Sequence, residues 1–342
     1  MKRLKLALIP VALAALATGA LAQSSVTIGG RIDLGLINAP DDLTKGTDSQ
    51  LKLNESSNGR LNISGREDMG DGLTSFFMLE MRFNADTGAQ TDAATLFKDK
   101  AWVGLAGKNW GEVKLGRLHS PQYGTGVAGR YEAFFGDSYA SMGTRGAMSA
   151  NQWNNAIYYT TPTFSGFNAG VIWQAGETLV ANGVGGHLAY ADGPLSVAFS
   201  YQKEQDKIAT TAINTMETKT LGAYYDFGVA RLMTTYARTT GANITDTGEE
   251  TVYTVGARIP MGPGELRVSY RKMDDTARKS ATDASSDQDS TRYAIGYAYF
   301  MSKQTSINLS LVRESQQRFN ANGSTKTDFS GTGYEVALRK MF

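Results

Sequence analysis

Apolar and polar side chains alternate one by one over most of this chain, and this period of two limits its fold more than any other feature. Between residues 195 and 201, Leu, Val, Phe and Tyr take every second position, with Ser, Ala and Ser between them. Successive side chains of a β-strand point to opposite faces, so such a stretch predicts a strand with one apolar face. The same alternation recurs at residues 26–36, 73–83, 266–271, 292–299 and 307–311.

The connections between the predicted strands differ regularly in length. Short breaks rich in Gly, Asp or Pro occur at 68–72, 107–111, 162–166, 192–194, 226–228, 260–264 and 301–304. Longer polar stretches lie between them at 39–50, 204–217, 239–249, 276–289 and 315–327. Tight turns that alternate with long loops are typical of an up-and-down antiparallel barrel in a membrane. Seven hairpins with a first and a last strand predict 16 strands, while 14 or 18 stay open.

The polar face of the predicted strands decides the environment. Arg, Asp, Glu, Ser and Gly recur on that face, and a ring of about 16 strands is too wide for side chains to fill. We therefore expect an all-β fold: a closed transmembrane barrel with its apolar face toward lipid and its polar face toward water, in which closure pairs every backbone polar group. Aromatic residues near strand ends fit an interfacial girdle, namely Phe164, Phe167, Tyr190, Phe227 and Phe300.

The N-terminus predicts export. Lys2, Arg3 and Lys5 precede an apolar stretch at 6–21, and Ala20 to Ala22 forms a small-x-small cleavage site. We expect a signal peptide over 1–22, cleaved before Gln23, and a single barrel domain over 23–342. A membrane anchor helix is the alternative, but the stretch is short and no stop-transfer pattern follows it.

Composition argues against several other functions. The chain has no Cys and two His, which excludes Cys-ligated metal centres and disfavours a His-rich metal site, and its formal charge of +1 does not suit a nucleic-acid partner. The glycines at 124, 126 and 129 match a dinucleotide fingerprint, yet they open no amphipathic helix. His119 beside Ser120 has no triad context, and Asp274 to Asp289 lacks calcium-loop spacing. We expect no enzyme, cofactor or metal.

Several short motifs occur in order along the chain. They are Val26 to Gly35, Gly59 to Asp68, Val113 to Arg117, Asn155 to Pro162 with Phe164 to Phe167, Tyr299 to Thr305, and the terminal Val336 to Phe342. On these motifs the sequence resembles the trimeric general diffusion porins of Gram-negative bacteria, most closely those of the beta-proteobacterial type. The resemblance implies a 16-stranded outer-membrane barrel, a homotrimer, passive passage of small hydrophilic solutes, and recognition of Phe342 by the barrel-assembly machinery.

Side-chain direction predicts the chemistry of the interior. If the apolar residues face lipid, the lumen receives a set of arginines, namely Arg31, Arg60, Arg66, Arg82, Arg231, Arg258, Arg267, Arg271 and Arg292. Inward acids on the strands are fewer, chiefly Asp33 and Glu80. Arginines around a narrow aqueous channel favour anions over cations, so we expect a modest anion preference.

The segment from His119 to Trp153 is the longest one without alternation. In the family that the chain resembles, the third loop folds into the lumen and forms the constriction, and Phe134 to Asp137 resembles its core motif. The chain departs from the family pattern at three places: Ala133 stands where an acid is usual, and Asp99 and Gln152 stand where basic residues are common.

Together these considerations predict one set of pore-lining and constriction residues. It consists of Arg31, Arg60, Arg66, Glu80, Arg82, Arg130, Glu132, Phe134, Asp137, Arg231, Arg267 and Arg292. The alternative function is a channel selective for organic anions, in which Arg82, Arg130, Tyr131 and Phe134 form a weak binding site.

Overall fold

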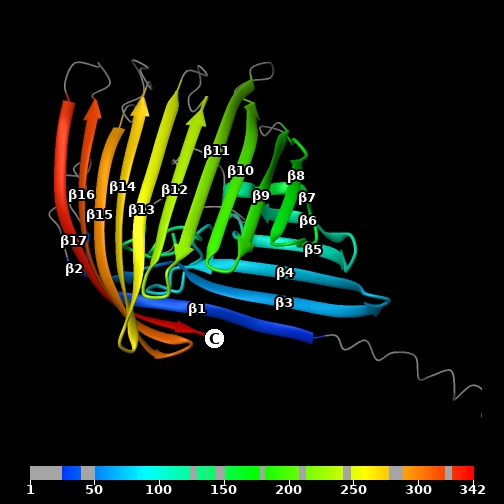
Figure 1. The fold of residues 1–342 in the computed structure, drawn as a ribbon, viewed down its shortest axis with the longest axis horizontal. Coiled ribbons are helices and arrows are strands. Elements are labelled where there is room, and N and C mark those ends of the chain that lie inside the picture. The colour runs from blue at the N-terminus through cyan, green and yellow to red at the C-terminus, as the bar shows by residue number, and fades with distance from the viewer. Residues whose placement is uncertain are drawn as a thin grey trace, which may run out of the picture.

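In a computed structural model of the chain, one antiparallel sheet closes on itself into a barrel (Figure 1). The structure describes residues 25–39, 51–123, 129–136, 138–142, 151–177, 182–207, 213–241, 248–276, 288–319 and 326–342. The strands are β1 (Ser25–Asn38), β2 (Leu51–Glu55), β3 (Gly59–Gly70), β4 (Leu73–Phe83), β5 (Lys100–Gly107), β6 (Gly111–His119), β7 (Gln152–Thr160), β8 (Phe167–Gln174), β9 (Gly183–Asp192), β10 (Leu195–Lys207), β11 (Ile213–Asp226), β12 (Arg231–Thr240), β13 (Glu249–Met261), β14 (Gly264–Thr276), β15 (Gln288–Ser302), β16 (Thr305–Phe319) and β17 (Lys326–Met341).

These 17 segments form the 16 strands that the sequence predicts, because β2 and β3 are two parts of one wall strand. Residues 25–31 of β1 pair with β3, and residues 34–38 pair with β2. The break between them falls at residues 56–58. On its other side, β1 pairs with β17 from Arg31↔Met341 to Asn38↔Tyr334. This last pairing closes the barrel, so that the described strands leave no free sheet edge.

Burial follows the predicted alternation. Along β12, Leu232 is 51% exposed on the outer surface while its neighbour Met233, which faces inward, is 2% exposed. Exposed large apolar side chains recur in this way on the outer face of nearly every strand. The expected girdle residues Phe164, Phe167, Phe227 and Phe300 are also exposed, and they lie beside the short turns. The apolar face is therefore the lipid face, as predicted.

The seven predicted tight turns are confirmed. The turn between β3 and β4 shows why such sites select Gly and Asp: Gly70, Asp71 and Gly72 have φ values of 86°, 52° and 76°, which most side chains disfavour. Four of the predicted long loops are shorter in the structure, because polar residues continue the strands. For example, β10 extends to Lys207 and β16 to Phe319. Strands that leave the membrane need no apolar face, so hydrophobicity marks their ends poorly.

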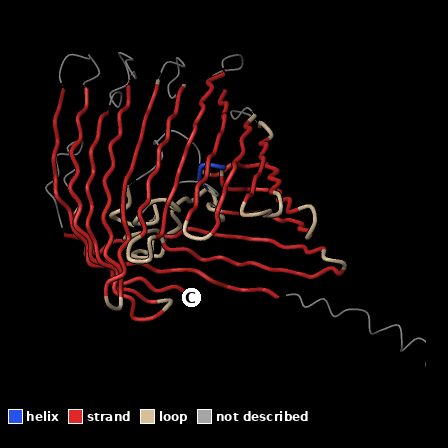
Figure 2. Tube along the Cα trace, in the orientation of Figure 1, coloured by secondary structure: helices blue, strands red, loops and turns tan. Residues whose placement is uncertain are grey.

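The barrel wall is uneven in height (Figure 1). The strands β5 to β8 contain 8 or 9 residues, whereas β15, β16 and β17 contain 15 or 16. Among the described residues, helix is confined to one turn at 121–123 (Figure 2). No helix in that part of the chain is long and apolar enough to cross a membrane.

Candidate functional site

The third long connection, between β6 and β7, enters the barrel and is tied to the inner wall. Three strand arginines donate hydrogen bonds to its backbone carbonyls: Arg258 Nε to Ala133 O at 2.9 Å, Arg271 Nη1 to Met142 O at 2.6 Å, and Arg292 Nη2 to Tyr139 O at 2.7 Å. The sequence predicts that these arginines face the lumen, and in the structure they hold the loop through these hydrogen bonds. A backbone at membrane depth needs such partners because lipid offers none.

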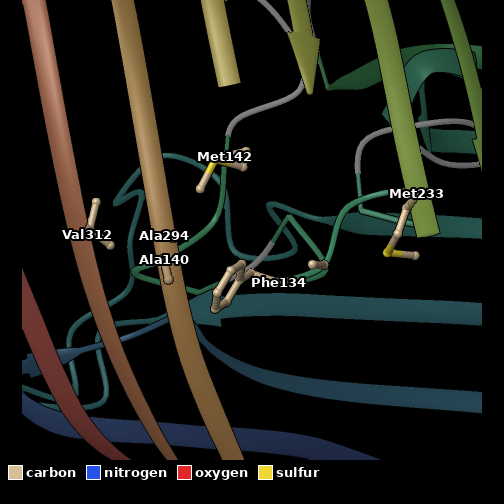
Figure 3. Packing of buried hydrophobic residues seen from close by; sticks show 7 residues of the cluster. Phe134, Ala140, Met142, Met233, Ala294 and Val312 are labelled. Carbon is tan, nitrogen blue, oxygen red and sulfur yellow. The ribbon is translucent and has the colours of Figure 1, made fainter. Parts of the chain in front are cut away.

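Apolar contacts also hold the same loop against the inner wall of the barrel. Phe134, Ala140 and Met142 pack against Met233 of β12, Ala294 of β15 and Val312 of β16 (Figure 3). Phe134 is 4% exposed. Gly296 of β15 makes room for its ring, since a Cβ there would lie 2.9 Å from Phe134 Cε1. The expectation that Phe134 lines the pore is corrected: its ring faces the wall and anchors the loop.

Glu132 is also buried rather than pore-lining, which corrects the second of the loop predictions. Its carboxylate accepts hydrogen bonds from the backbone N–H groups of Phe134 and Met142, both at 3.2 Å, and from that of Gly136. Burial raises the pKa of Glu132, and the three N–H groups act in the opposite direction. The side chain therefore shapes the loop from within. Asp137 lies outside the described residues.

A charged cluster covers the inner wall at β3, β4 and β5. Arg60 Nη1 lies 3.2 Å from Glu80 Oε1 and 3.5 Å from Asp99 Oδ2. Lys100 Nζ lies 3.1 Å from Glu80 Oε2 and 3.8 Å from Asp99 Oδ2, and Arg82 forms an ion pair with Asp99. Three cations thus surround two carboxylates. The structure brings together the predicted residues Arg60, Glu80 and Arg82, and adds Lys100 and Asp99.

The two wall positions that depart from the family pattern face each other. Gln152 Nε2 donates a hydrogen bond of 2.8 Å to Asp99 Oδ1, and His119 Nε2 lies 3.3 Å from Asp99 Oδ2. Burial alone raises the pKa of Asp99, but its contacts with His119, Glu80 and Arg82 outweigh burial, so its pKa is lowered. Asp99 is therefore a permanent negative charge within the cluster.

Within this wall cluster the carboxylates lie beneath the cations. The side chains of Glu80 and Asp99 are 6% and 0% exposed, against 19% for Arg60, 14% for Arg82 and 23% for Lys100. An ion that enters the lumen therefore meets guanidinium and ammonium groups first.

Acids are more numerous inside than the sequence indicated, and this corrects the prediction of few inward carboxylates. Glu314 of β16 pairs with Arg271 at 3.0 Å and with Arg292 at 2.5 Å. Asp33 is fully buried and accepts two hydrogen bonds from Arg339, at 2.8 and 2.6 Å. Glu335, Glu250 and Glu265 also face inward. The alternation of side chains along a strand places Glu335 and Glu265 on the inner face, so the sequence contains a signal for both. Glu314 directly precedes the polar stretch 315–327, which predicts a loop, so the sequence gives no direction for its side chain.

The remaining predicted residues are dispersed. Arg130 is exposed on the loop, with its guanidinium 5.9 Å from the Tyr131 ring centre. Arg66 lies near the turn between β3 and β4, 5.8 Å from the Phe76 ring. Arg231 pairs with Asp226 at 2.6 Å at the start of β12.

Phe135 is a lumen residue that the sequence does not predict. Its ring is 44% exposed and lies under two arginines, with centre-to-guanidinium distances of 3.3 Å for Arg258 and 4.9 Å for Arg267. Together with Arg31, Phe135 and Arg267 line a cavity of about 400 Å³ at the turn end of the lumen. Phe134 and Phe135 are adjacent in the motif, and two successive aromatics carry no signal that tells which of them faces water.

Other chemistries find little support in the described residues. His187 on β9 hydrogen-bonds Tyr158 OH at 2.7 Å and Asn168 Oδ1 at 2.9 Å, as expected of a wall residue. No group of three or more His, Cys, Asp or Glu side chains in that part of the chain could hold a metal ion. Gly124 and Gly126 of the dinucleotide-like motif, and most of Asp274 to Asp289, lie outside it.

Comparisons with known proteins agree with this geometry. The family described as Gram-negative porin matches residues 7–318. The chain is 31% identical over 367 residues to outer membrane porin protein 32 of Delftia acidovorans, covering 99% of this chain and 100% of that protein. It is 29% identical over 358 residues to an outer membrane porin protein of Bordetella pertussis, covering 86% and 90%. A solved anion-selective porin from Comamonas acidovorans superposes with a TM-score of 0.77 at 28% identity, covering 94% and 100%.

Proposed function

The chain belongs to the Gram-negative porin family, and from that premise we propose that it passes small hydrophilic solutes and ions passively with a preference for anions. It is an outer-membrane β-barrel. The anion-selective relative from Comamonas supports the sign of the preference. The observation in this chain that supports it best is the layering of charge in the wall cluster, where cations lie above buried carboxylates.

We assign the preference to Arg60, Arg82 and Lys100. In the water-filled lumen beside this wall, one uncompensated charge at roughly 4 to 8 Å from a passing ion is worth about 0.5–1 kcal/mol even at the dielectric constant of water. It acts with opposite sign on cations and anions, so each lost charge should change the permeability ratio severalfold. The loop residue Arg130 adds a further exposed cation.

The test is the zero-current potential across a planar bilayer with a salt gradient. The wild-type channel should give the sign of anion preference, and Arg60→Gln, Arg82→Gln and Lys100→Gln combined should move the potential toward zero or reverse it. Arg238→Gln is the matched control, because Arg238 is an equally basic residue that pairs with Glu249 on the outer face. A wild-type potential of cation sign, or a triple variant like the wild type, contradicts the assignment.

We do not propose the alternative function, a channel selective for organic anions, because its binding site is not assembled. It requires Arg82, Arg130, Tyr131 and Phe134 around one site, but Tyr131 is fully buried against Ala198 and Tyr224, and Phe134 faces the wall. We also assign no catalytic role to the chain. Turnover of any substrate that is lost on changing His119 or His187 would contradict this.

Processing and assembly complete the proposal. We infer that residues 1–22 direct export and are removed before Gln23, leaving one barrel domain over 23–342. We further infer a homotrimer, and recognition of Phe342 during insertion; Phe342 is 48% exposed and its backbone pairs with Gly30.

A further inference from the structure

A cavity of about 400 Å³ lies inside the barrel at the turn end of the lumen, and side-chain size explains it. Two arginines stand on either side of it, Arg267 on β14 and Arg339 on β17. The strands between them carry small side chains at these heights. Gly296 of β15 is the register partner of Arg267, and Ser306 of β16 has the same relation to the second arginine. We call this hollow the turn-end cavity, and its volume is within the range of about 300–1,000 Å³ that is typical of small-molecule sites.

One part of the turn-end cavity is apolar. Phe135 of the inserted loop lines it, together with Met341 at the end of β17. Phe135 has a φ of 63°, in the left-handed region that large side chains rarely adopt, and the residue is 44% exposed. The Arg258 guanidinium lies 3.3 Å from the ring centre and holds the ring in place. A ring that is held in a water-filled space offers apolar surface to a solute.

The charged side chains of the turn-end cavity are mostly cations. Among the described residues that line it, four are basic and one is acidic, namely Arg31, Arg267, Lys303 and Arg339 against Glu265. Glu265 Oε1 lies 2.8 Å from Arg267 Nε, and Arg339 pairs with the buried Asp33. In the part of the chain that the structure describes, Lys303 in the turn between β15 and β16 has no carboxylate within 4.0 Å. The cavity therefore has an excess of positive charge, even with Asp33 included.

The turn-end cavity lies between the inserted loop and the periplasm. Phe135 of the loop lines one part of it, and Lys303 of a short turn lines another. The short turns of outer-membrane barrels face the periplasm. A solute that enters from outside therefore passes the inserted loop before it reaches the cavity, whereas a solute from the periplasm reaches the cavity directly.

We propose that the turn-end cavity is a weak binding site for small carboxylates with an apolar body, of which aromatic monocarboxylates are the simplest. The carboxylate contacts Lys303 and Arg31, because hydrogen bonds from cations are the strongest that it can accept. The apolar body lies against Phe135 and Met341. The inference rests on the proposed function, since it concerns a solute on its way through the channel. It places the site on the periplasmic side of the inserted loop rather than around Arg82.

The probe is benzoate, added to one side of a planar bilayer that holds single channels of the full-length protein, all inserted from the same side. Benzoate on the periplasmic side should reduce the current at a lower concentration than benzoate on the external side. Acetate has the carboxylate without the ring. Burial of about 60 Å² of the ring corresponds to about tenfold in affinity, so acetate should need about ten times the concentration. Lys303→Gln should raise the half-blocking concentration of benzoate about fivefold, which is the effect of one charge at about 4 Å in water.

Two further variants separate the apolar contact from a general loss of charge. Phe135→Asn removes the ring with a residue that tolerates a positive φ, and it should abolish the difference between benzoate and acetate. Lys108→Gln is the matched control, because Lys108 is an exposed lysine of the turn between β5 and β6, outside the cavity. This variant should be blocked like the wild type. The current of each variant without solute shows that its barrel is folded.

Three results overturn the proposal: equal block by benzoate from the two sides, equal block by acetate, or a Lys303→Gln channel that is blocked like the wild type. The zero-current potential in potassium chloride, measured on the same channels, tests the proposed function separately. An anion-selective channel that benzoate does not block contradicts this inference and leaves the proposed function in place. A cation-selective channel contradicts the proposed function, and the block by benzoate still decides whether the site exists.

Discussion

At the scale of single residues, Asp99 shows how one buried charge sets the balance of the lumen. It is fully buried and contacts Arg60, Arg82, Lys100 and His119. Asp99→Asn should increase the anion preference, because the same cations then face one carboxylate fewer. It should also destabilise the barrel by about 1–3 kcal/mol, since the cations lose a buried partner. Zero-current potential and the urea midpoint of unfolding measure the two effects.

The pKa of Asp99 gives this prediction a pH dependence. Because its pKa is lowered in the folded protein, its contribution to stability is complete above the unfolded value of about 3.9 and is lost as the pH falls toward the folded value. The difference in midpoint between wild type and Asp99→Asn should therefore shrink as the pH falls below about 4. A difference that grows below that pH would contradict this account.

At the scale of elements, the position of the inserted loop depends on its apolar contacts with the wall as much as on the hydrogen bonds that it accepts from arginines. Phe134→Ala should release the loop from β15 and β16, because it removes a buried ring at a cost of about 3–5 kcal/mol. We expect noisier single-channel current and proteolytic cleavage within the loop. Phe227→Ala removes an exposed ring on the outer surface and should change neither. A quiet, protease-resistant Phe134→Ala channel would show that the arginines alone hold the loop.

At the scale of the whole molecule, the low side of the barrel is the side we expect within a trimer. Register with Ala101 places Arg117 on the outer face of β6, where it donates to Lys98 O at 2.7 Å and to Asn154. An arginine toward lipid costs up to about 2–4 kcal/mol, and a protein neighbour removes that cost. Arg117→Leu should therefore lower the temperature at which trimers dissociate on seminative gels, whereas a lipid-facing Arg117 would give trimers that are equally or more heat-resistant.

The sequence by itself determined the antiparallel barrel and the positions of its tight turns, and its hairpins predicted 16 strands with 14 or 18 left open. Side-chain direction in a strand is a local property, so alternation such as that of Leu195 to Tyr201 can be read without knowing any neighbour. The same local rule placed Arg60, Glu80 and Arg82 inside. Where polar strand ends leave the membrane the rule loses its signal, as at Lys207 and Phe319.

Only the tertiary structure decided which charges meet and where the loop lies. Asp33 and Arg339 are 306 residues apart in sequence and become partners when the first and last strands pair. Arg258, Arg271 and Arg292 all point inward by alternation, yet they hold loop carbonyls because the loop crosses that part of the wall. Contacts across strands depend on register and closure, which are properties of the whole ring and leave no mark in any single strand.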